Sequence, residues 1–288
     1  MTDQAGRLRE LTGRGGGPSP RVLAISSGKG GVGKTNVVVN LSLAFAGMNQ
    51  RVVVMDADFG LANVDILLGL APKYTLRHVL FGSDEERMRL EDIIIEGPAG
   101  IRIIPASSGM QELTNLNDEQ RSRLFGALSR LATQTDILVL DTAAGISDNV
   151  VQLLLAANEI ILVTCPEPTA IVDAYALVKV VSGYEFDKKI QVVVNMANSD
   201  AEGQAVFEQL DAVVDKFLGR RLDYLGAVAR DDHVLRAVRQ QQPLLGLYPN
   251  SASARGFVAL ARQLLHEPPQ QSKAGGFRRF VRQLVGRR

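Results

Sequence analysis

The chain contains one cysteine and no tryptophan among its 288 residues, and aromatic residues make up only 5% of it. A single cysteine, Cys165, cannot form an intramolecular disulfide, which suits a reducing compartment. It also supplies too few thiolates for an iron–sulfur cluster held by four cysteines of one chain. These scarcities exclude a disulfide framework and such a cluster, and we expect Cys165 to be a small buried apolar residue.

Long apolar runs and an excess of charge of one sign are also absent. No apolar run reaches the ~18–20 residues that a membrane-spanning helix requires. The first residues are polar and charged, unlike a secretory signal. The 32 Lys and Arg residues nearly balance 31 Asp and Glu residues, so the net charge of +1 demands no polyanionic partner. We therefore expect a cytoplasmic protein whose contact with a membrane is peripheral.

Hydrophobic residues make up 46% of the chain, which is enough for one large core. Between residues 21 and 268, apolar runs typical of buried strands alternate with helical patterns. The expected strands are 22–25, 51–55, 101–104, 136–141, 159–164, 190–194 and 222–228, and the expected helices are 36–46, 118–132, 147–157, 169–182, 201–218, 232–240 and 252–266. This rhythm predicts a single α/β domain with a mostly parallel central sheet and helices on both faces. Residues 1–20 form a flexible N-terminal extension, and residues 269–288 form a linker and a C-terminal helix.

A glycine-rich stretch, Ser27–Thr35, lies between the first expected strand and a helix. Gly28 to Thr35 matches the phosphate-loop pattern in the strand–loop–helix context which that pattern requires. Glycines let backbone amides surround phosphate oxygens, and the start of the helix favours anions. Lys34 would bridge the outer phosphates, and the Thr35 hydroxyl would ligate Mg²⁺. The expected nucleotide-binding residues of this stretch are Gly28, Lys29, Gly30, Gly31, Val32, Gly33, Lys34, Thr35 and Asn36.

Polar side chains follow other expected strands. Asp56 and Asp58 leave the second strand, and Asp141 ends a strand after four apolar residues, as a Walker-B-type aspartate does. Asn195 ends another strand. Ligands of open parallel sheets bind beyond the carboxyl ends of the strands, so these residues should converge on the phosphate loop. Asp56 and Asp141 are candidate Mg²⁺ residues that act through water. The alternative for Asp56 and Asp58 is simple turn formation.

The second lysine of the loop, Lys29, resembles the deviant phosphate loop of the MinD/ParA ATPases. The resemblance implies a P-loop NTPase fold, ATP hydrolysis with Mg²⁺ and a homodimer that sandwiches ATP. In that family this lysine reaches the partner's phosphates, so Lys29 joins Lys34 and Asp58 as a catalytic residue. The alternative is that Lys29 is a solvated loop side chain.

The resemblance also assigns roles to individual residues beyond the loop. It implies that Asp56 orders the water around Mg²⁺ and that Asp58 positions the attacking water. It implies that Asn195 reads the adenine edge and that Asp231 lies in the other adenine loop. Ala229 stands where relatives usually have proline, which weakens the Asp231 contact. Both residue types are also common in turns.

Three segments look like those of flagellar-number regulators of the FlhG/FleN type, namely 56–65, 141–145 and 167–177. An N-terminal motif agrees at each of its fixed positions, which are Asp3, Gln4, Ala5, Leu8 and Arg9. In that family the motif docks on FlhF, a GTPase of the signal-recognition-particle type, and stimulates it. The resemblance therefore implies control of flagellum number or placement, with a flagellar transcription activator or flagellar switch proteins as further partners. The alternative is a random tail.

The C-terminal stretch has an amphipathic pattern. Its apolar residues share one helical face at i, i+3, i+4, i+7 and i+8, and they are Phe277, Phe280, Val281, Leu284 and Val285. Arginines fill the other side, which suits an anionic membrane surface. ATP would drive dimerisation and so attachment to the inner face of the cell membrane, at the cell pole. The alternative is a helix that docks on the core.

Other members of the class remain as competing hypotheses. A ParA-type ATPase would partition DNA through a basic dimer surface, whereas the basic residues here concentrate in the tail, so we expect no specific nucleic acid. A MinD-type ATPase would place the division septum. Iron–sulfur carriers need more cysteines than Cys165 alone. A scaffold that binds ATP without hydrolysis would be unaffected by loss of Asp58.

Overall fold

The computed structural model describes residues 20–58, 63–81, 88–105 and 117–267, together with Phe277, Phe280 and Val281. The candidate GTPase motif at residues 3–9, as well as Leu284 and Val285, lies outside the described residues. In the described part of the chain, no helix combines the length and apolar content needed to cross a bilayer.

Within the described ranges, eight strands form one sheet in the order β3-β4-β2-β5-β1-β6-β7-β8. Their bounds are β1 Arg21–Ser26, β2 Val52–Ala57, β3 Ile95–Glu96, β4 Arg102–Ile104, β5 Ile137–Thr142, β6 Glu159–Thr164, β7 Ile190–Ala197 and β8 Asp223–Ala229. Neighbouring strands pair in parallel, apart from β3 and β4, which pair antiparallel. Every residue of β1, β2, β5 and β6 is buried, as expected of parallel strands that are covered on both faces.

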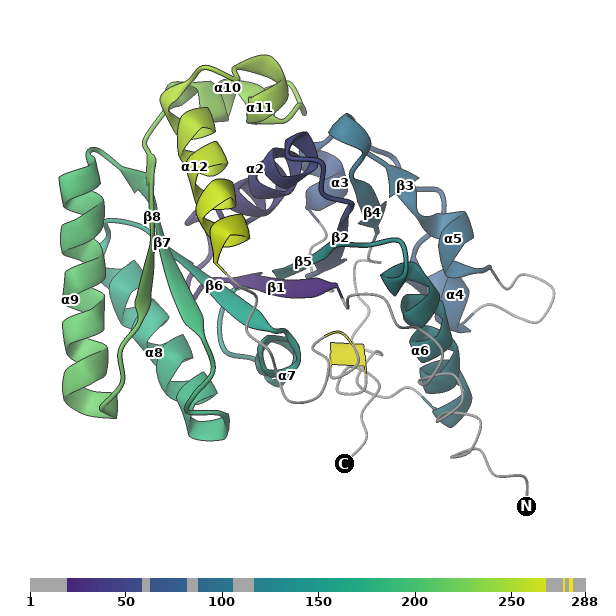
Figure 1. The fold of residues 1–288 in the computed structure, drawn as a ribbon, viewed down its shortest axis with the longest axis horizontal. Coiled ribbons are helices and arrows are strands. Elements are labelled where there is room, and N and C mark those ends of the chain that lie inside the picture. The colour runs from purple at the N-terminus through teal and green to yellow at the C-terminus, as the bar shows by residue number, and fades with distance from the viewer. Residues whose placement is uncertain are drawn as a thin grey trace.

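Helices cover both faces of this sheet (Figure 1). One face carries α2 Lys34–Gly47, α3 Val64–Leu67, α10 Asp232–Arg239, α11 Leu244–Leu247 and α12 Ala252–His266. The other face carries α4 Leu76–Phe81, α5 Leu90–Ile93, α6 Asp118–Ala132, α7 Asp148–Ala156, α8 Pro168–Tyr184 and α9 Asp200–Leu218. A short 3₁₀ turn, η1, spans Pro98–Gly100. The predicted α/β domain with helices on both faces is confirmed.

Two regions differ from the sequence prediction. The seventh strand continues to Ala197 instead of ending near residue 194, because a bulge between Val194 and Ala197 lets pairing with β8 resume. Among the described residues of 63–98, the structure has three short α-helices and the strand β3, which the sequence did not predict. Elements of two to six residues are too short to show a clear hydrophobic period.

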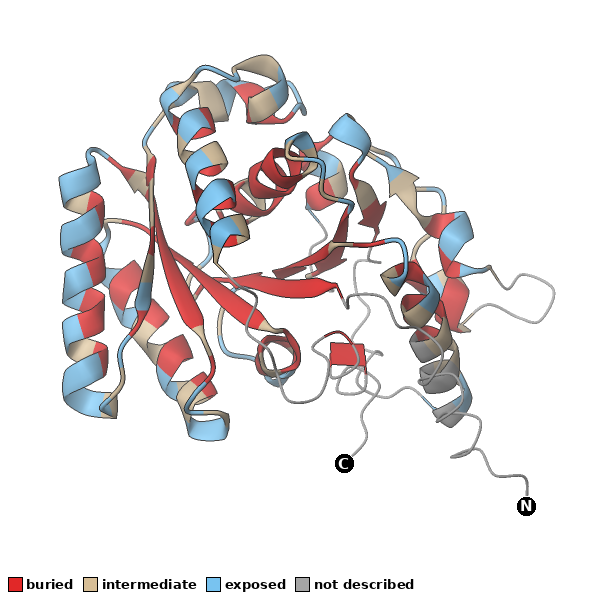
Figure 2. Ribbon diagram, in the orientation of Figure 1, coloured by how far each residue is buried: buried red, intermediate tan, exposed pale blue. Residues whose placement is uncertain are grey.

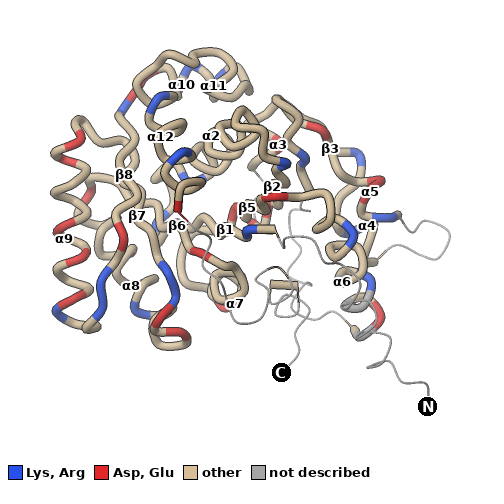
Figure 3. The backbone as a smooth tube through the Cα atoms, viewed as in Figure 1, with Lys and Arg blue, Asp and Glu red and all other residues tan. Residues whose placement is uncertain are grey.

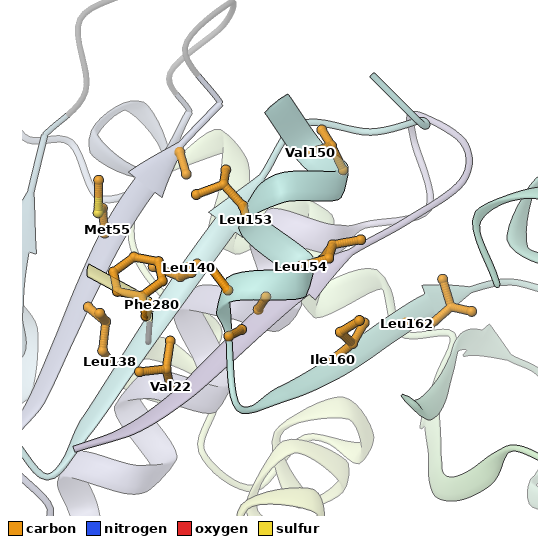
Figure 4. Close-up of a cluster of buried hydrophobic side chains, with 14 of the residues drawn as sticks. Val22, Met55, Leu138, Leu140, Val150, Leu153, Leu154, Ile160, Leu162 and Phe280 are labelled. Atoms are coloured by element: carbon orange, nitrogen blue, oxygen red, sulfur yellow. The ribbon is translucent and has the colours of Figure 1, made fainter. Parts of the chain in front are cut away.

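The C-terminal residues that the structure describes lie in the core. Phe277, Phe280 and Val281 are 4%, 0% and 0% exposed and belong to the apolar cluster on the face of α7. The central strands of the sheet are buried throughout in Figure 2, and Figure 4 shows Phe280 against them, among Met55, Leu138 and Leu140. Of the two alternatives for the C-terminal segment, docking on the core describes these three residues.

Candidate functional site

The phosphate loop follows β1 at its carboxyl end and leads directly into α2. Its shape depends on glycine, because Gly31 and Gly33 have φ angles of 84° and 82°, in the left-handed region. A Cβ atom on Gly28 would overlap the backbone of Asp173 in α8. Gly28 therefore lets the loop pack directly against α8. Gly31 and Gly33 hold a backbone conformation that residues with side chains rarely adopt.

Lys34, the first residue of α2, forms an ion pair with the carboxylate of Asp141 in β5. Its Nζ atom contacts Asp141 Oδ1 at the end of β5, and the two side chains are 10% and 1% exposed. The Thr35 hydroxyl also bonds the Asp141 side chain. Burial raises the pKa of Asp141, against the opposing effects of Lys34 and the Thr35 hydroxyl. The structure thus joins Lys34 and Thr35 to Asp141, which lies more than a hundred positions further along the chain.

Asp56 lies opposite Asp141 in the register of β2 and β5. Its carboxylate accepts backbone N–H groups from Asp58, Asn63 and Val64 at 3.0, 3.0 and 3.2 Å. Burial and the neighbouring Asp141 raise the pKa of Asp56 to about 7, although these hydrogen bonds lower it. Asp58 begins the loop beyond the strand, next to this pair of carboxylates.

These donors fit Mg²⁺. Two buried carboxylates and a hydroxyl meet at the strand ends, and the repulsion that raises the pKa of Asp56 is what a cation would relieve. Among the described residues, no cluster of three or more His, Cys, Asp or Glu side chains forms a metal site. A magnesium ion at this position would therefore need phosphate and water oxygens as well, which is its usual preference.

Lys29 turns away from the loop toward the start of α8. Its Nζ atom donates to Glu167 Oε2 at 2.8 Å and to Thr169 Oγ1 at 2.9 Å, and the side chain is 37% exposed. The hydrogen bond from Lys29 lowers the pKa of Glu167. In the single chain Lys29 is therefore held by its own subunit, at the surface of the site. The contacts of Lys29 with Glu167 and Thr169 join segments about 140 positions apart, so only the structure could show them.

The two candidate adenine residues lie at the ends of neighbouring strands. Asn195 is 6% exposed, and its Nδ2 atom donates to the Val32 carbonyl at 2.9 Å. Asp231 caps α10, where its carboxylate accepts the backbone N–H of His233 at 3.0 Å and that of Ser253 at 3.1 Å. The structure brings Asn195 to the phosphate loop itself, whereas Asp231 holds together α10 and α12.

The remaining loop at this edge also contacts the phosphate loop. The Gly145 N–H, beyond β5, donates to the Ser27 carbonyl at 2.8 Å. Exposed apolar side chains lie on the segments that follow β2, β5 and β6. They are Ile66, Ile146 and Val172, at 56%, 48% and 65% exposure. Figure 3 shows both basic and acidic positions scattered over the described helices and loops. The edge of the sheet that carries the phosphate loop therefore also presents apolar surface.

Known proteins resemble this chain over most of its length. Residues 20–194 match the AAA domain family. The antiactivator FleN of Pseudomonas aeruginosa is 44% identical over 265 residues, which cover 92% of this chain and 93% of FleN. The flagellum site-determining protein YlxH of Helicobacter pylori is 31% identical, over 92% of this chain and 90% of YlxH.

A solved structure agrees in fold. The septum site-determining protein MinD of Pyrococcus horikoshii, complexed with Mg-ADP, superposes with a TM-score of 0.68 at 25% identity. The match covers 85% of this chain and 96% of that one.

Proposed function

The chain belongs to the MinD/ParA family of P-loop ATPases, and from this premise we propose that it is a Mg-ATP-dependent switch controlling flagellum number or placement. In this proposal ATP drives formation of a homodimer that binds the inner face of the cell membrane, and hydrolysis reverses both steps. The observation that carries the ATPase part is the convergence of Lys34, Thr35, Asp56 and Asp141 at one edge of the sheet. The flagellar part rests on similarity to FleN and YlxH along nine-tenths of the chain.

Each residue of the site has a role in the proposed hydrolysis. The loop amides and Lys34 would hold the phosphates, and a bound Mg²⁺ would neutralise charge on their oxygens. Asp58 would orient the attacking water, which matters because positioning dominates this chemistry. Lys29 would leave Glu167 and Thr169 to reach the phosphates of a second subunit.

The surface around the loop supports the proposed homodimer. Ile66, Ile146 and Val172 are exposed apolar side chains on elements that follow strands ending at this edge. Pairing two such edges would bury these side chains and bring each Lys29 toward the partner's nucleotide. In that arrangement the site is complete only in the dimer.

Membrane attachment is proposed through the C-terminal segment. Phe277, Phe280 and Val281 pack on the core in the single chain, so attachment would require them to leave it. Two such segments in one dimer would gain effective concentration at a lipid surface. We propose that the N-terminal motif, Asp3 to Arg9, stimulates a GTPase of the signal-recognition-particle type.

The ATPase proposal is tested by replacing Asp58. The Asp58→Ala protein should still bind Mg-ATP and dimerise, whereas its hydrolysis rate should fall at least about 100-fold. Asp187→Ala, an exposed aspartate beyond α8, is the matched control and should hydrolyse ATP at the parental rate. Unchanged turnover in Asp58→Ala would contradict the assignment and favour a scaffold that only binds nucleotide.

The flagellar part has its own test. Full-length protein and a version lacking residues 1–12 should both hydrolyse ATP, but only the full-length protein should capture the GTPase FlhF and raise its GTP turnover. Equal capture by both versions would remove this assignment and leave the ATPase class. Salt-sensitive binding to DNA, without binding to anionic vesicles, would favour a ParA-type function instead.

A further inference from the structure

We propose that Asn195 is a positioning residue for the phosphate loop, so that one side chain links the base-binding and phosphate-binding parts of the site. The inference rests on the proposed ATPase function and goes beyond the adenine contact expected of this residue. It follows from the contact between the Asn195 amide and the phosphate loop within the protein itself.

The Asn195 side chain is built into the wall behind the loop. It is 6% exposed, and its Nδ2 atom donates to the carbonyl of Val32 at 2.9 Å. Val32 is itself 2% exposed and belongs to the apolar cluster that contains α2. A buried polar group is normally satisfied, so losing this donor would leave the Val32 carbonyl without the bond.

The next residue of the loop, Gly33, packs closely against the Asn195 side chain. A Cβ atom on Gly33 would overlap Asn195 Nδ2 and would approach Met196 Cε to 3.1 Å. Gly33 directly precedes Lys34, and its φ of 82° sets the direction in which α2 begins. The end of β7 thus supports the turn that aims Lys34 into the site.

The backbone of β7 is distorted at this point. Met196 has a φ of 58°, which is uncommon for a residue with a side chain, and the pairing with β8 shifts between Val194 and Ala197. Bulges of this kind re-aim a side chain next to a functional site. Here the residue whose direction is set by the distortion is Asn195.

The chemistry of an amide allows both contacts at once. The bond to Val32 uses one N–H of Nδ2, and an amide has a second N–H and a carbonyl oxygen. An adenine edge that engages those atoms would therefore hold the same group that holds the loop. Base binding would stabilise the loop conformation that receives the phosphates, which is positive coupling between the two parts of the site.

Inorganic tripolyphosphate separates the two roles, because it carries the phosphates of ATP without a base. The affinities of Mg-ATP and Mg-tripolyphosphate are measured by calorimetry for the parent, Asn195→Ala, Asn195→Asp and Asn198→Ala. Asn195→Ala should weaken Mg-tripolyphosphate by a factor of about five to ten, the range for one hydrogen bond, and should weaken Mg-ATP by more, because the contact with the base is lost as well. Asn195→Asp, which keeps the size but opposes the Val32 carbonyl with a carboxylate, should weaken tripolyphosphate further.

Asn198→Ala is the matched control, because Asn198 is exposed three residues along and bonds only Glu202 among the contacts described for its side chain. It should bind both ligands as the parent does. Thermal unfolding without ligand and hydrogen exchange of the loop amides are measured for the same variants. They separate a local effect on the loop from a general loss of stability. We expect faster exchange in the loop of Asn195→Ala with little change in the unfolding temperature.

Three results would overturn the proposal, in distinguishable ways. If Asn195→Ala weakens Mg-ATP and leaves Mg-tripolyphosphate unchanged, Asn195 reads the base only and the ATPase function stands. If the parent protein binds neither ligand, the proposed function itself fails, and the role of Asn195 fails with it. A loss of affinity that only follows a fall in unfolding temperature would show a general structural role and would also overturn the proposal.

Discussion

At the scale of single residues, the surroundings of Asp231 lower the pKa of its carboxyl group. Burial would raise its pKa, but the N–H groups of His233 and Ser253 and the side chains of His233 and Ser251 outweigh this effect. Together they lower the pKa of Asp231 to about 2. The side chain is 7% exposed, so these bonds are shielded from water.

The pKa of Asp231 predicts a dependence of stability on pH. Because the folded value lies below the ordinary 3.8, its contribution is full above pH 4 and is lost as the pH falls toward 2. Asp231→Asn should therefore lower the free energy of unfolding by about 1–2 kcal/mol at pH 7 and by little at pH 2. Urea unfolding at several pH values measures this, and a difference that persists at pH 2 would contradict it.

Lys29 and Glu167 give a second prediction at this scale. Their contact lies at the surface and holds Lys29 within its own subunit. Glu167→Gln removes the negative charge beside Lys29 and so should weaken its hold within the subunit and lower the ATP concentration at which dimers form, whereas Lys29→Ala should prevent dimers. Analytical ultracentrifugation across an ATP series measures both. Reduced dimerisation of Glu167→Gln would show that Glu167 acts across the interface instead.

At the scale of elements, Phe277, Phe280 and Val281 complete the apolar cluster on the face of the sheet that carries α7. Phe280 is fully buried against residues of β2 and β5, as Figure 4 shows. Phe280→Ala should lower the free energy of unfolding by about 3–5 kcal/mol, because it leaves a cavity in the core. The control is Phe217→Ala, whose ring is 64% exposed and whose loss should change stability by about 0.5 kcal/mol or less. Equal, small effects would mean that Phe280 is not packed in solution.

A buried ion pair joins three elements at the opposite edge of the sheet. Arg21 in β1 donates to both carboxylate oxygens of Glu159 in β6 at 2.7 Å, and its Nη1 atom contacts the Leu264 carbonyl of α12. Arg21→Leu should cost about 3 kcal/mol, because it leaves the Glu159 carboxylate buried with the more distant Lys189, at 3.8 Å, as its cation.

The double variant Arg21→Leu/Glu159→Leu tests that reason. It should recover much of the lost stability, since neither charge of the pair remains buried. Arg51→Leu, which breaks the exposed pair with Asp136, is the control and should have a much smaller effect. A double variant as unstable as the single one would show that the bond to α12, not the buried charge, dominates.

At the scale of the whole molecule, the proposed switch requires one segment to occupy two places. Three of the residues that would enter the lipid headgroup region, Phe277, Phe280 and Val281, are part of the core in this structure. Because the chain has no tryptophan, Phe280→Trp introduces a single fluorescent reporter of the segment's position. Its emission should be blue-shifted and shielded from acrylamide in the free protein.

The same reporter distinguishes release from permanent docking. With ATP and anionic vesicles that contain brominated lipid, the fluorescence of the Phe280→Trp protein should be quenched by the lipid. Phe217→Trp, an exposed position at the far end of α9, should remain open to acrylamide in both states. Fluorescence that stays shielded and unquenched with ATP and vesicles would contradict membrane attachment through this segment.

The fold class and the components of the phosphate site follow from the order of the amino acids alone. Buried parallel strands are continuous apolar runs, and the glycines of Gly28 to Thr35 occur at the spacing that a phosphate loop requires. Local sequence patterns are therefore sufficient to predict the fold class and this loop. Folding in three dimensions was needed to show which partner each side chain has. Lys29 bonds Glu167, Asn195 bonds Val32 and Phe280 lies in the core, and each contact joins segments whose separation along the chain no periodicity records. An amphipathic segment in particular has the same pattern whether its apolar face meets lipid or the protein's own sheet, so only the packing of the whole molecule could choose between them.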